Sequence, residues 1–349
     1  MTVTALADSA VLAGSIGFDV GGLIDRFWSL TVEGLTYGSI YALVAVGYTL
    51  VYGVLRLINF AHSEIFMIGL FGQYIGLMLL GFEPRGNAYN QGTFLTIVFL
   101  GLAMLIGMAI SGGAALGLER VAYRPLRKRG ARPLSFLITA IGMSFVLQEF
   151  VHYVLPEISD KLGIPRLGGN NAQEKIKLVE AKEQFNVFGA SVTNVTLIII
   201  AAAVVLAAMT EILINRTKFG RGIRAVAQDP DTATLMGVSR EKVIMLTFLI
   251  GGVLAGAAAL LFSLRVPEGI MYTSGFVLGI KAFSAAVLGG IGNLRGALLG
   301  GLLLGMAEMY GQALFGEAWR DVVAFVLLVA VLMIRPTGIL GESLGRARV

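Results

Sequence analysis

The feature that most constrains this chain is a series of apolar stretches, each about as long as a bilayer is thick. Runs near the ~20 residues that a membrane-spanning helix needs lie at about 30–54, 60–80, 94–118, 134–155, 194–214, 243–263, 275–291, 297–315 and 320–335. Only 14% of the 349 residues are charged, whereas a soluble domain carries about 25%. We therefore predict an all-α polytopic membrane protein with about nine transmembrane helices, within a range of about 8–10.

The basic residues predict the orientation of these helices. Segments 120–132 and 215–242 each hold six Lys or Arg residues, while segment 156–190 holds five basic and five acidic residues. The positive-inside rule places the first two segments in the cytoplasm and the third outside. We expect the amino terminus outside and the carboxyl terminus inside. The formal charge of +5 reflects these segments and does not indicate nucleic-acid binding.

The same pattern divides the chain into three parts. Residues 30–341 are predicted to form a single integral membrane domain, with a cytoplasmic loop at 215–242 and an extracytoplasmic loop at 156–190. Residues 1–29 form an extension outside, and residues 342–349 form a cytoplasmic tail. The extension has no basic residue before Arg26, so it lacks the positive start of a cleavable signal peptide and we expect it to be retained.

Glycine is expected to control how the helices pack. Four pairs have four-residue spacing: Gly34/Gly38, Gly252/Gly256, Gly296/Gly300 and Gly301/Gly305. Such pairs let two helix backbones approach closely, and we expect packing within the chain rather than a dimer seam. The eight prolines lie in loops or at helix ends, so helix breaks must come from glycine. The run GGIGNLRG at 289–296 predicts a tight turn or an unwound break.

Polar residues inside apolar runs are functional candidates because they are costly at membrane depth. The densest set is Asn59, His62, Ser63 and Glu64. One interpretation is a polar lining of a translocation path. The other is a short cytoplasmic turn, in which Asn59 caps the next helix and Glu64 lies near its positive end.

Two further ionisable residues lie deep in apolar runs. Lys281 either faces a pathway or extends its ammonium group to the membrane interface. Glu308 lies near the middle of 297–315, which favours a pathway or an inter-helix hydrogen bond. Four other acids lie near segment ends and are interpreted as interface or capping groups: Glu33, Glu149, Glu211 and Asp321.

The chain carries no recognisable catalytic motif. It has no Walker A sequence, no cysteine and only two histidines, so we predict neither an enzyme nor a metal site nor a bound cofactor. Energy for any transport must come from an ion gradient or from another subunit.

Four stretches together resemble the permease subunits of branched-chain amino-acid ABC importers, specifically the LivH-type subunit. They are residues 34–69, containing INFAHSE; residues 119–127, ERVAYRPLR; residues 220–252, containing AVAQDPDTATLMGVS; and residues 281–308 followed by 321–341, containing LGGIGNLRGALLGG and RPTGILG. One departure is visible, because this family usually has glycine at the position of Ser63.

The resemblance implies an ABC importer permease fold with glycine-interrupted helices in a prokaryotic cell membrane. It implies a second permease subunit, two cytoplasmic ATPase subunits that hold ATP and Mg²⁺, and an extracytoplasmic binding protein. The substrate would be a branched-chain or other aliphatic amino acid, with urea or short amides as the alternative within the family. The lipid bilayer is the remaining partner, and no nucleic acid is expected.

The resemblance also implies that segment 220–237 is a coupling helix that docks on the ATPase. Asp229 with Pro230 would begin this helix and Gly237 would end it. Six residues are candidates for the contact: Arg221, Arg224, Ala227, Asp229, Ala233 and Gly237. The two arginines would pair with acids of the ATPase, and the small alanines would allow close approach.

Two other functions remain open from the residues alone. A secondary transporter would carry its own coupling-ion site, for which Glu308 and Lys281 are the best support. A scaffold for assembling membrane complexes would need no polar groups in its interior.

Overall fold

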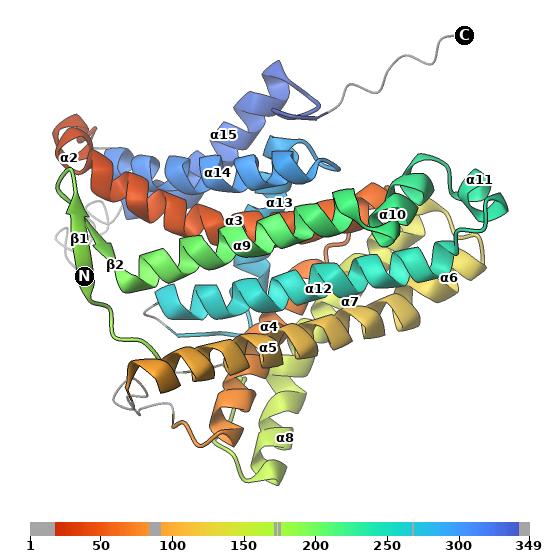
Figure 1. Cartoon of the computed structure of the whole chain (residues 1–349), viewed down its shortest axis with the longest axis horizontal. Coiled ribbons are helices and arrows are strands. Elements are labelled where there is room, and N and C mark those ends of the chain that lie inside the picture. The colour runs from red at the N-terminus through yellow and green to blue at the C-terminus, as the bar shows by residue number, and fades with distance from the viewer. Residues whose placement is uncertain (1–17, 84–91, 171–172, 174–175, 267–268, 342–349) are drawn as a thin grey trace, which may run out of the picture.

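A computed structural model describes residues 18–83, 92–170, 173, 176–266 and 269–341 of the chain. Within these residues, six helices are long and apolar enough to cross a membrane (Figure 1). They comprise α3 (Phe27–Leu55), α5 (Thr93–Leu118), α7 (Pro133–Glu149), α9 (Asn194–Arg216), α12 (Arg240–Arg265) and α14 (Leu294–Phe315), two of them extended by further helical turns. The prediction of a mostly helical, multi-pass membrane protein is confirmed.

Shorter helices complete the bundle. The apolar runs at 60–80, 275–291 and 320–335 form α4 (His62–Leu79), α13 (Ser274–Gly289) and α15 (Arg320–Ile334). The remaining helices lie at the ends of the bundle: α2 (Val20–Asp25), α6 (Arg124–Lys128), α8 (Leu155–Leu162), α10 (Lys218–Gln228), α11 (Pro230–Leu235) and a 3-10 turn at Glu317–Trp319. Helices α3, α4, α12, α13 and α14 form the buried core.

Several predicted boundaries are wrong. Segment 120–132 is largely helical, because a π-helical stretch at Glu119–Tyr123 joins α5 to α6 in one helix of 35 residues, Phe94–Lys128. Loop 156–190 contains most of α8 and a strand, β1 (Glu183–Val187), which pairs antiparallel with β2 (Ala190–Thr193), so the chain is not strictly all-α. Helix α3 begins at Phe27, before the predicted residue 30. Residues 1–17 of the predicted extension, and the whole predicted tail at 342–349, lie outside the described residues.

The glycine pairs pack helices within the chain, as predicted. A Cβ atom at Gly34 or Gly38 of α3 would lie 2.7 or 2.8 Å from a backbone Cα of α14, at Met306 or Leu302. A Cβ atom at Gly256 of α12 would lie 2.4 Å from the Gly107 carbonyl oxygen of α5. Because these neighbours are backbone atoms, no side-chain movement can make room for a larger residue.

This close packing predicts opposite effects for one substitution at two glycines of α3. Alanine normally stabilises a helix relative to glycine by about 1 kcal/mol, and Gly53→Ala should do so because nothing lies within 4 Å of its added Cβ. Gly38→Ala should instead destabilise by about 1–3 kcal/mol through overpacking. Thermal unfolding of the two variants in detergent measures the difference. Equal stability would show that the α3–α14 seam is looser than described.

The run at 289–296 forms a tight turn between α13 and α14. Gly290 and Gly292 have φ angles of 108° and 99°, and the Asn293 side chain caps α14 by accepting hydrogen bonds from the N–H groups of Arg295 and Gly296. The segment after α15 covers this turn, because the Ile339 and Leu340 N–H groups donate to the Leu288 and Gly289 carbonyls at 2.9 Å each. Two buried carbonyl groups at the end of α13 thereby receive hydrogen bonds from the distant end of the described chain.

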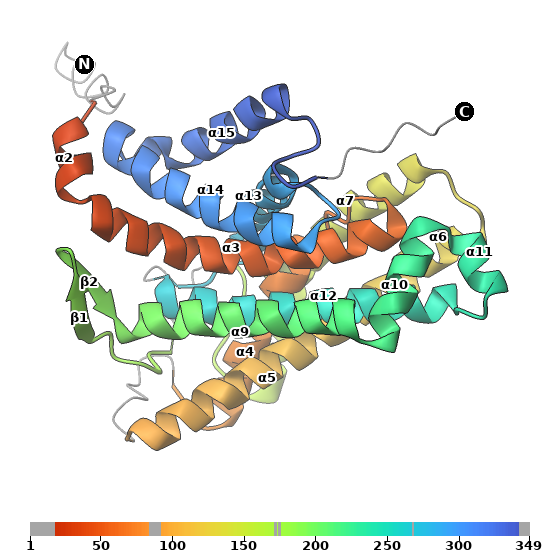
Figure 2. The ribbon, with the colours of Figure 1, turned by 45° about the horizontal axis from the view of Figure 1, so that its top comes forward.

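The elements separate into two ends (Figure 2). Helices α6, α10 and α11 lie together at one end, next to the turn that follows α3. Helix α2 and the β1–β2 hairpin lie at the other end. The two segments richest in basic residues therefore share one end of the bundle, which is the arrangement that the charge pattern predicted.

Candidate functional site

Helix α4 begins inside the bundle, beside the middle of the second half of α3 rather than beside its end. Helix α3 stops at Leu55, followed by Arg56 with a φ of 56°. A Cβ atom at Gly47, eight residues before Leu55, would lie 2.3 Å from the His62 Nε2 atom, which corresponds to a depth of about 12 Å along α3. Segment 56–61 therefore turns back into the protein. Irregular backbone at such depth is tolerated where protein buries it, and Ala61 is fully buried.

Asn59 and His62 are both buried, but Asn59 does not cap α4. The first residue outside the helix is Ala61, and no side chain caps it. The Asn59 Oδ1 atom instead accepts a hydrogen bond of 2.8 Å from the Tyr123 hydroxyl, which lies on the π-helical stretch. The predicted capping of α4 by Asn59 is therefore wrong. The His62 ring packs edge-on against Tyr48 at 4.8 Å between ring centres.

Glu64 is buried between three helices. Its Oε1 atom accepts hydrogen bonds from the hydroxyls of Ser63, at 3.3 Å, and Ser144 of α7, at 3.2 Å. Its Oε2 atom has no hydrogen-bond partner among the described residues. A Cβ atom at Gly275 of α13 would lie 2.9 Å from this Oε2 atom. Glu64 thus joins α4 to α7 and faces α13.

Ser63 occupies its position because α13 has a glycine opposite it. A Cβ atom at Gly279 would lie 2.1 Å from the Ser63 Cβ atom, so a side chain at one position excludes one at the other. The single Ser63 hydroxyl proton is shared between Glu64 and the Phe60 carbonyl oxygen, and the contact to Phe60 is the shorter at 2.8 Å. This contact holds the turn before α4.

This contact predicts a rescue experiment. Gly279→Ala should destabilise the protein by about 1–3 kcal/mol because the new Cβ meets that of Ser63. Adding Ser63→Gly removes the opposing atom, and the double variant should regain most of the lost stability. Unfolding midpoints of the two single variants and the double variant give the coupling energy. Additive effects of the two substitutions would contradict the contact.

Lys281 and Glu308, which are both buried, meet in a charge cluster, which we define as Lys281, Glu308, Arg320 and Asp321. The Asp321 side chain is 55% exposed. The Lys281 Nζ atom lies 3.1 Å from Glu308 Oε1 and 2.6 Å from Asp321 Oδ1. The Arg320 Nε atom donates to Glu308 Oε2 at 3.1 Å, and the Tyr41 hydroxyl donates to the same oxygen at 2.9 Å. Two cations therefore balance two anions between α3, α13, α14 and α15.

Sequence reasoning missed three members of this arrangement. Asp321 was interpreted as an interface or capping group, and neither Arg320 nor Tyr41 was a candidate. The signal that would have found them is charge balance, because a buried carboxylate such as Glu308 and a buried ammonium such as Lys281 each need a partner. The Lys281 ammonium group lies between the buried Glu308 and the exposed Asp321 carboxylate. The other predicted end-group acids form exposed ion pairs, such as that of Glu211 with Arg295.

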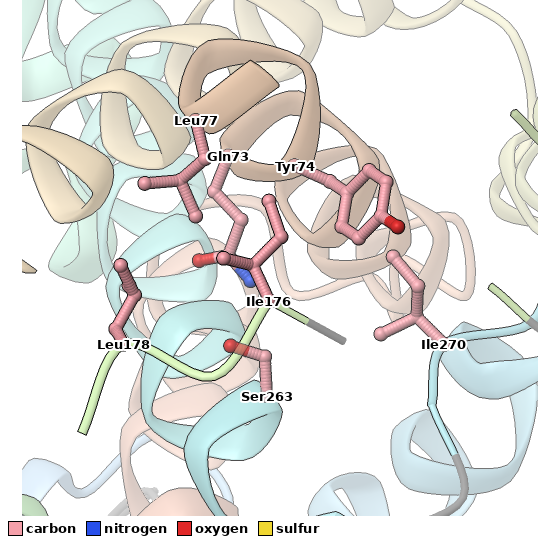
Figure 3. Close-up of a pocket in the computed structure, with 7 residues that line it drawn as sticks. All are labelled: Gln73, Tyr74, Leu77, Ile176, Leu178, Ser263 and Ile270. Carbon is pink, nitrogen blue, oxygen red and sulfur yellow. The ribbon is translucent and has the colours of Figure 1, made fainter. Parts of the chain in front are cut away.

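A small hollow lies where α4 and α12 meet the segment after α8 (Figure 3). The Gln73 side chain is 2% exposed and lines this hollow. Its amide donates to the Ala259 carbonyl at 3.2 Å, and its Oε1 atom has no hydrogen-bond partner among the described residues. The rest of the lining is Tyr74, Leu77, Ile176, Leu178, Ser263 and Ile270. The five predicted pathway residues are not part of it.

The polar loop, residues 215–242, folds as two short helices with the predicted start and stop signals. Asp229 caps α11 by accepting hydrogen bonds from the N–H groups of Asp231 and Thr232 at 3.0 and 3.1 Å. Hydrogen bonds from Thr232 hold the pKa of Asp229 below its usual value of 3.8. The cap is therefore fully formed above that value and is lost as the pH falls through the lowered pKa. Gly237 ends the helix with a φ of 84°.

The side chains that the polar loop exposes differ from those predicted. Arg221 and Arg224 are exposed, as a partner contact requires, although Arg224 also donates to the Ile214 carbonyl. Ala233 is 5% exposed and packs into the chain's own core, so it is not available to a partner. Leu235 and Met236 instead project from the tip with 88% and 80% of their surface exposed.

These features define a class of protein: a multi-pass helical membrane subunit with buried polar groups between its helices and a structured polar loop at one end. The chain belongs to the family described as the permease component of branched-chain amino acid transport systems, whose model matches residues 30–332. It is a LivH-type member of that family.

The chain is similar to permeases of two bacteria. It is 42% identical over 314 residues to the "High-affinity branched-chain amino acid transport system permease protein BraD" of Pseudomonas aeruginosa, covering 89% of this chain and 94% of that protein. It is 41% identical, with the same coverage, to the protein LivH of Escherichia coli K12. Among solved structures, the chain matches "PsaBC from Streptococcus pneumoniae in complex with Fab" at 12% identity and a TM-score of 0.45, over 91% of this chain and 97% of that chain.

Proposed function

We propose that this chain is the permease subunit of an ATP-driven importer and forms half of a translocation pathway for branched-chain or other aliphatic amino acids. The observation that carries the proposal is the family match across residues 30–332. The names of BraD and LivH, the relatives that are 42% and 41% identical, supply the substrate class. The polar loop adds physical support, because it presents an exposed apolar tip at one end of a membrane bundle.

We infer nine membrane crossings, with the amino terminus outside and the carboxyl terminus in the cytoplasm. Six long helices and the shorter α4, α13 and α15 correspond to the nine apolar runs. The shared end of α6, α10 and α11 is rich in Lys and Arg, which favours the cytoplasmic side. An odd number of crossings then puts the start of α3 and the end of α15 on opposite sides.

The partners follow from this function. A second permease subunit would complete the pathway, two cytoplasmic ATPase subunits would bind ATP and Mg²⁺, and an extracytoplasmic protein would deliver the amino acid. This chain lacks a P-loop sequence, so we assign ATP hydrolysis to those ATPase subunits. The docking element on this chain would be the polar loop, with Leu235 and Met236 at its centre and Arg221 and Arg224 at its edge.

The buried polar residues would change partners as the pathway opens. Asn59, His62, Glu64, Lys281 and Glu308 lie inside the described chain rather than on its surface, which suits a closed arrangement. Each is held by groups on a different helix, so a movement between helices would expose it. Buried ionisable groups of this kind are expected along transport pathways.

Uptake in vesicles tests the proposal. This chain is reconstituted together with the second permease subunit and the binding protein, with and without the ATPase subunits. Uptake of a labelled aliphatic amino acid is measured with internal ATP or under an imposed proton or sodium gradient. We expect uptake only with both ATP and the ATPase subunits. Uptake driven by a gradient without them would establish a secondary transporter instead, and the absence of uptake under every condition would favour a scaffold.

A further inference from the structure

A cluster of basic side chains surrounds an open hollow at the end of α5. The residues that line it are Arg120, Arg124, Pro125, Lys128 and Arg129, which we call the basic hollow. Arg120, Arg124 and Lys128 follow one another at intervals of four residues on one continuous helix, so their side chains share one face. The hollow is therefore built by regular structure and not by a mobile loop.

The charge of this region is only partly neutralised by the chain itself. Six basic residues lie between 120 and 132, and this segment contains no acid. Two carboxylates contact them: Glu119 pairs with Arg127 at 2.7 Å, and Glu241 of α12 pairs with Arg124. Among the described residues, Arg120, Lys128 and Arg129 make no ion pair.

Exposed apolar side chains lie on the same helix as these cations and on the next helix along the chain. Val121 is 72% exposed and stands one residue from Arg120. Leu134 and Ile138, in the first turns of α7, are 64% and 62% exposed. All three belong to helices that are long and apolar enough to cross a membrane. A ligand that fits this surface has an anionic group for the hollow and hydrocarbon for the adjoining helices.

We propose that the basic hollow is a binding site for an anionic phospholipid, whose phosphate group sits among Arg120, Lys128 and Arg129 while its acyl chains lie along α5 and α7. Bidentate arginine contacts and a lysine point charge both suit phosphate oxygens. Cationic pockets beside membrane helices attract anionic headgroups. The apolar flank favours lipid over an acidic protein surface, which would leave Val121 and Leu134 without a partner.

The site also has a mechanical consequence. Arg124 connects the hollow to Glu241, which lies at the end of the polar loop and in the first turn of α12. A phosphate group in the hollow would compete with Glu241 for the Arg124 guanidinium group. The lipid would thereby influence how the polar loop is held against the bundle. This part of the inference rests on the proposed role of the polar loop, whereas the binding site itself does not.

The test compares two triple variants with the same charge change. The first is Arg120→Gln with Lys128→Gln and Arg129→Gln, which leaves the Arg124–Glu241 pair intact. The control is Arg216→Gln with Lys218→Gln and Arg221→Gln in the polar loop, whose side chains do not line the hollow. Binding of a phosphatidylglycerol and of a phosphatidylcholine with identical acyl chains is measured on the full chain in detergent, by native mass spectrometry.

We expect the unaltered chain and the control to prefer phosphatidylglycerol, and the first variant to lose that preference by a factor of about 100 for three charges. Equal loss in both variants would show unspecific attraction, and an unchanged preference in the first variant would also overturn the proposal. Glycerol phosphate that displaces the lipid at equal concentration would show that hydrocarbon contributes nothing. If the first variant binds lipid normally but no longer copurifies with the ATPase subunits, the hollow is a site for a protein partner instead. Unfolding midpoints confirm that each variant is folded.

Discussion

Replacing Glu308 with alanine is expected to destabilise this protein by about 3–5 kcal/mol, the usual cost of removing one member of a buried ion pair. The side chain is fully buried and holds Lys281 at 3.1 Å and Arg320 at 3.1 Å. Its removal leaves the Lys281 ammonium, which is 10% exposed, with Asp321 alone. Unfolding midpoints in detergent measure the loss, and uptake per folded molecule should fall as well.

Glu211→Ala is the matched control for this prediction. Glu211 also pairs with an arginine, Arg295, but that arginine side chain is 73% exposed. Exposed pairs contribute about 0–1 kcal/mol, so stability and uptake should change little. A double variant, Glu308→Gln with Lys281→Met, removes both buried charges and should recover part of the stability. Equal effects of Glu308→Ala and Glu211→Ala would show that burial within the bundle is a poor guide to importance.

Replacing Gly237 with valine is expected to uncouple ATP hydrolysis from uptake. A β-branched residue is strained at a φ of 84°, at a cost of about 1–2 kcal/mol or more. The strain falls on the end of α11, where the Val238 N–H donates to the Ala233 carbonyl at 3.0 Å. The exposed tip formed by Leu235 and Met236 would then be misplaced. Stimulation of the ATPase by the substrate-loaded binding protein is the measurement.

Gly189→Val provides the control, because Gly189 has a φ of 89° and, like Gly237, nothing within 4 Å of an added Cβ. It lies between β1 and β2, at the other end of the bundle. The backbone strain is therefore similar, but the polar loop is unaffected, and coupling should remain. Leu235→Ser with Met236→Ser should uncouple the protein without backbone strain. If all of these variants keep full substrate-stimulated ATPase activity, the polar loop is not the coupling element.

Prediction from sequence worked best where one physical requirement dominated. A bilayer demands long uncharged helices, so each apolar run corresponds to a helix, although two of these helices continue to Lys128 and Leu162, beyond the predicted ends. The glycine pairs Gly34/Gly38 and Gly301/Gly305 were correctly assigned to packing within the chain. Asp229, Pro230 and Gly237 set the bounds of α11 because capping and positive φ angles are local properties.

Prediction failed where a residue's role depends on a distant partner. Asn59 was assigned a local cap, yet its partner is Tyr123, 64 positions further along the chain. Ala233 was assigned to an outer surface, but the fold of the polar loop turns it inward. The helical continuity through 119–128 was also missed. Segment 120–132 holds six basic residues, and such a density of charge is typical of a loop.

The order of the residues alone determined that this chain crosses a membrane many times, which family it resembles, and where its short capped helices begin and end. These properties depend on hydrophobicity and on backbone preferences over a few neighbouring residues. Only the tertiary structure brought Lys281, Glu308, Arg320 and Asp321 together, turned segment 56–61 back into the bundle, and left Leu235 and Met236 exposed. Such placements depend on contacts between segments far apart in the chain, and composition and spacing carry no information about which helix faces which.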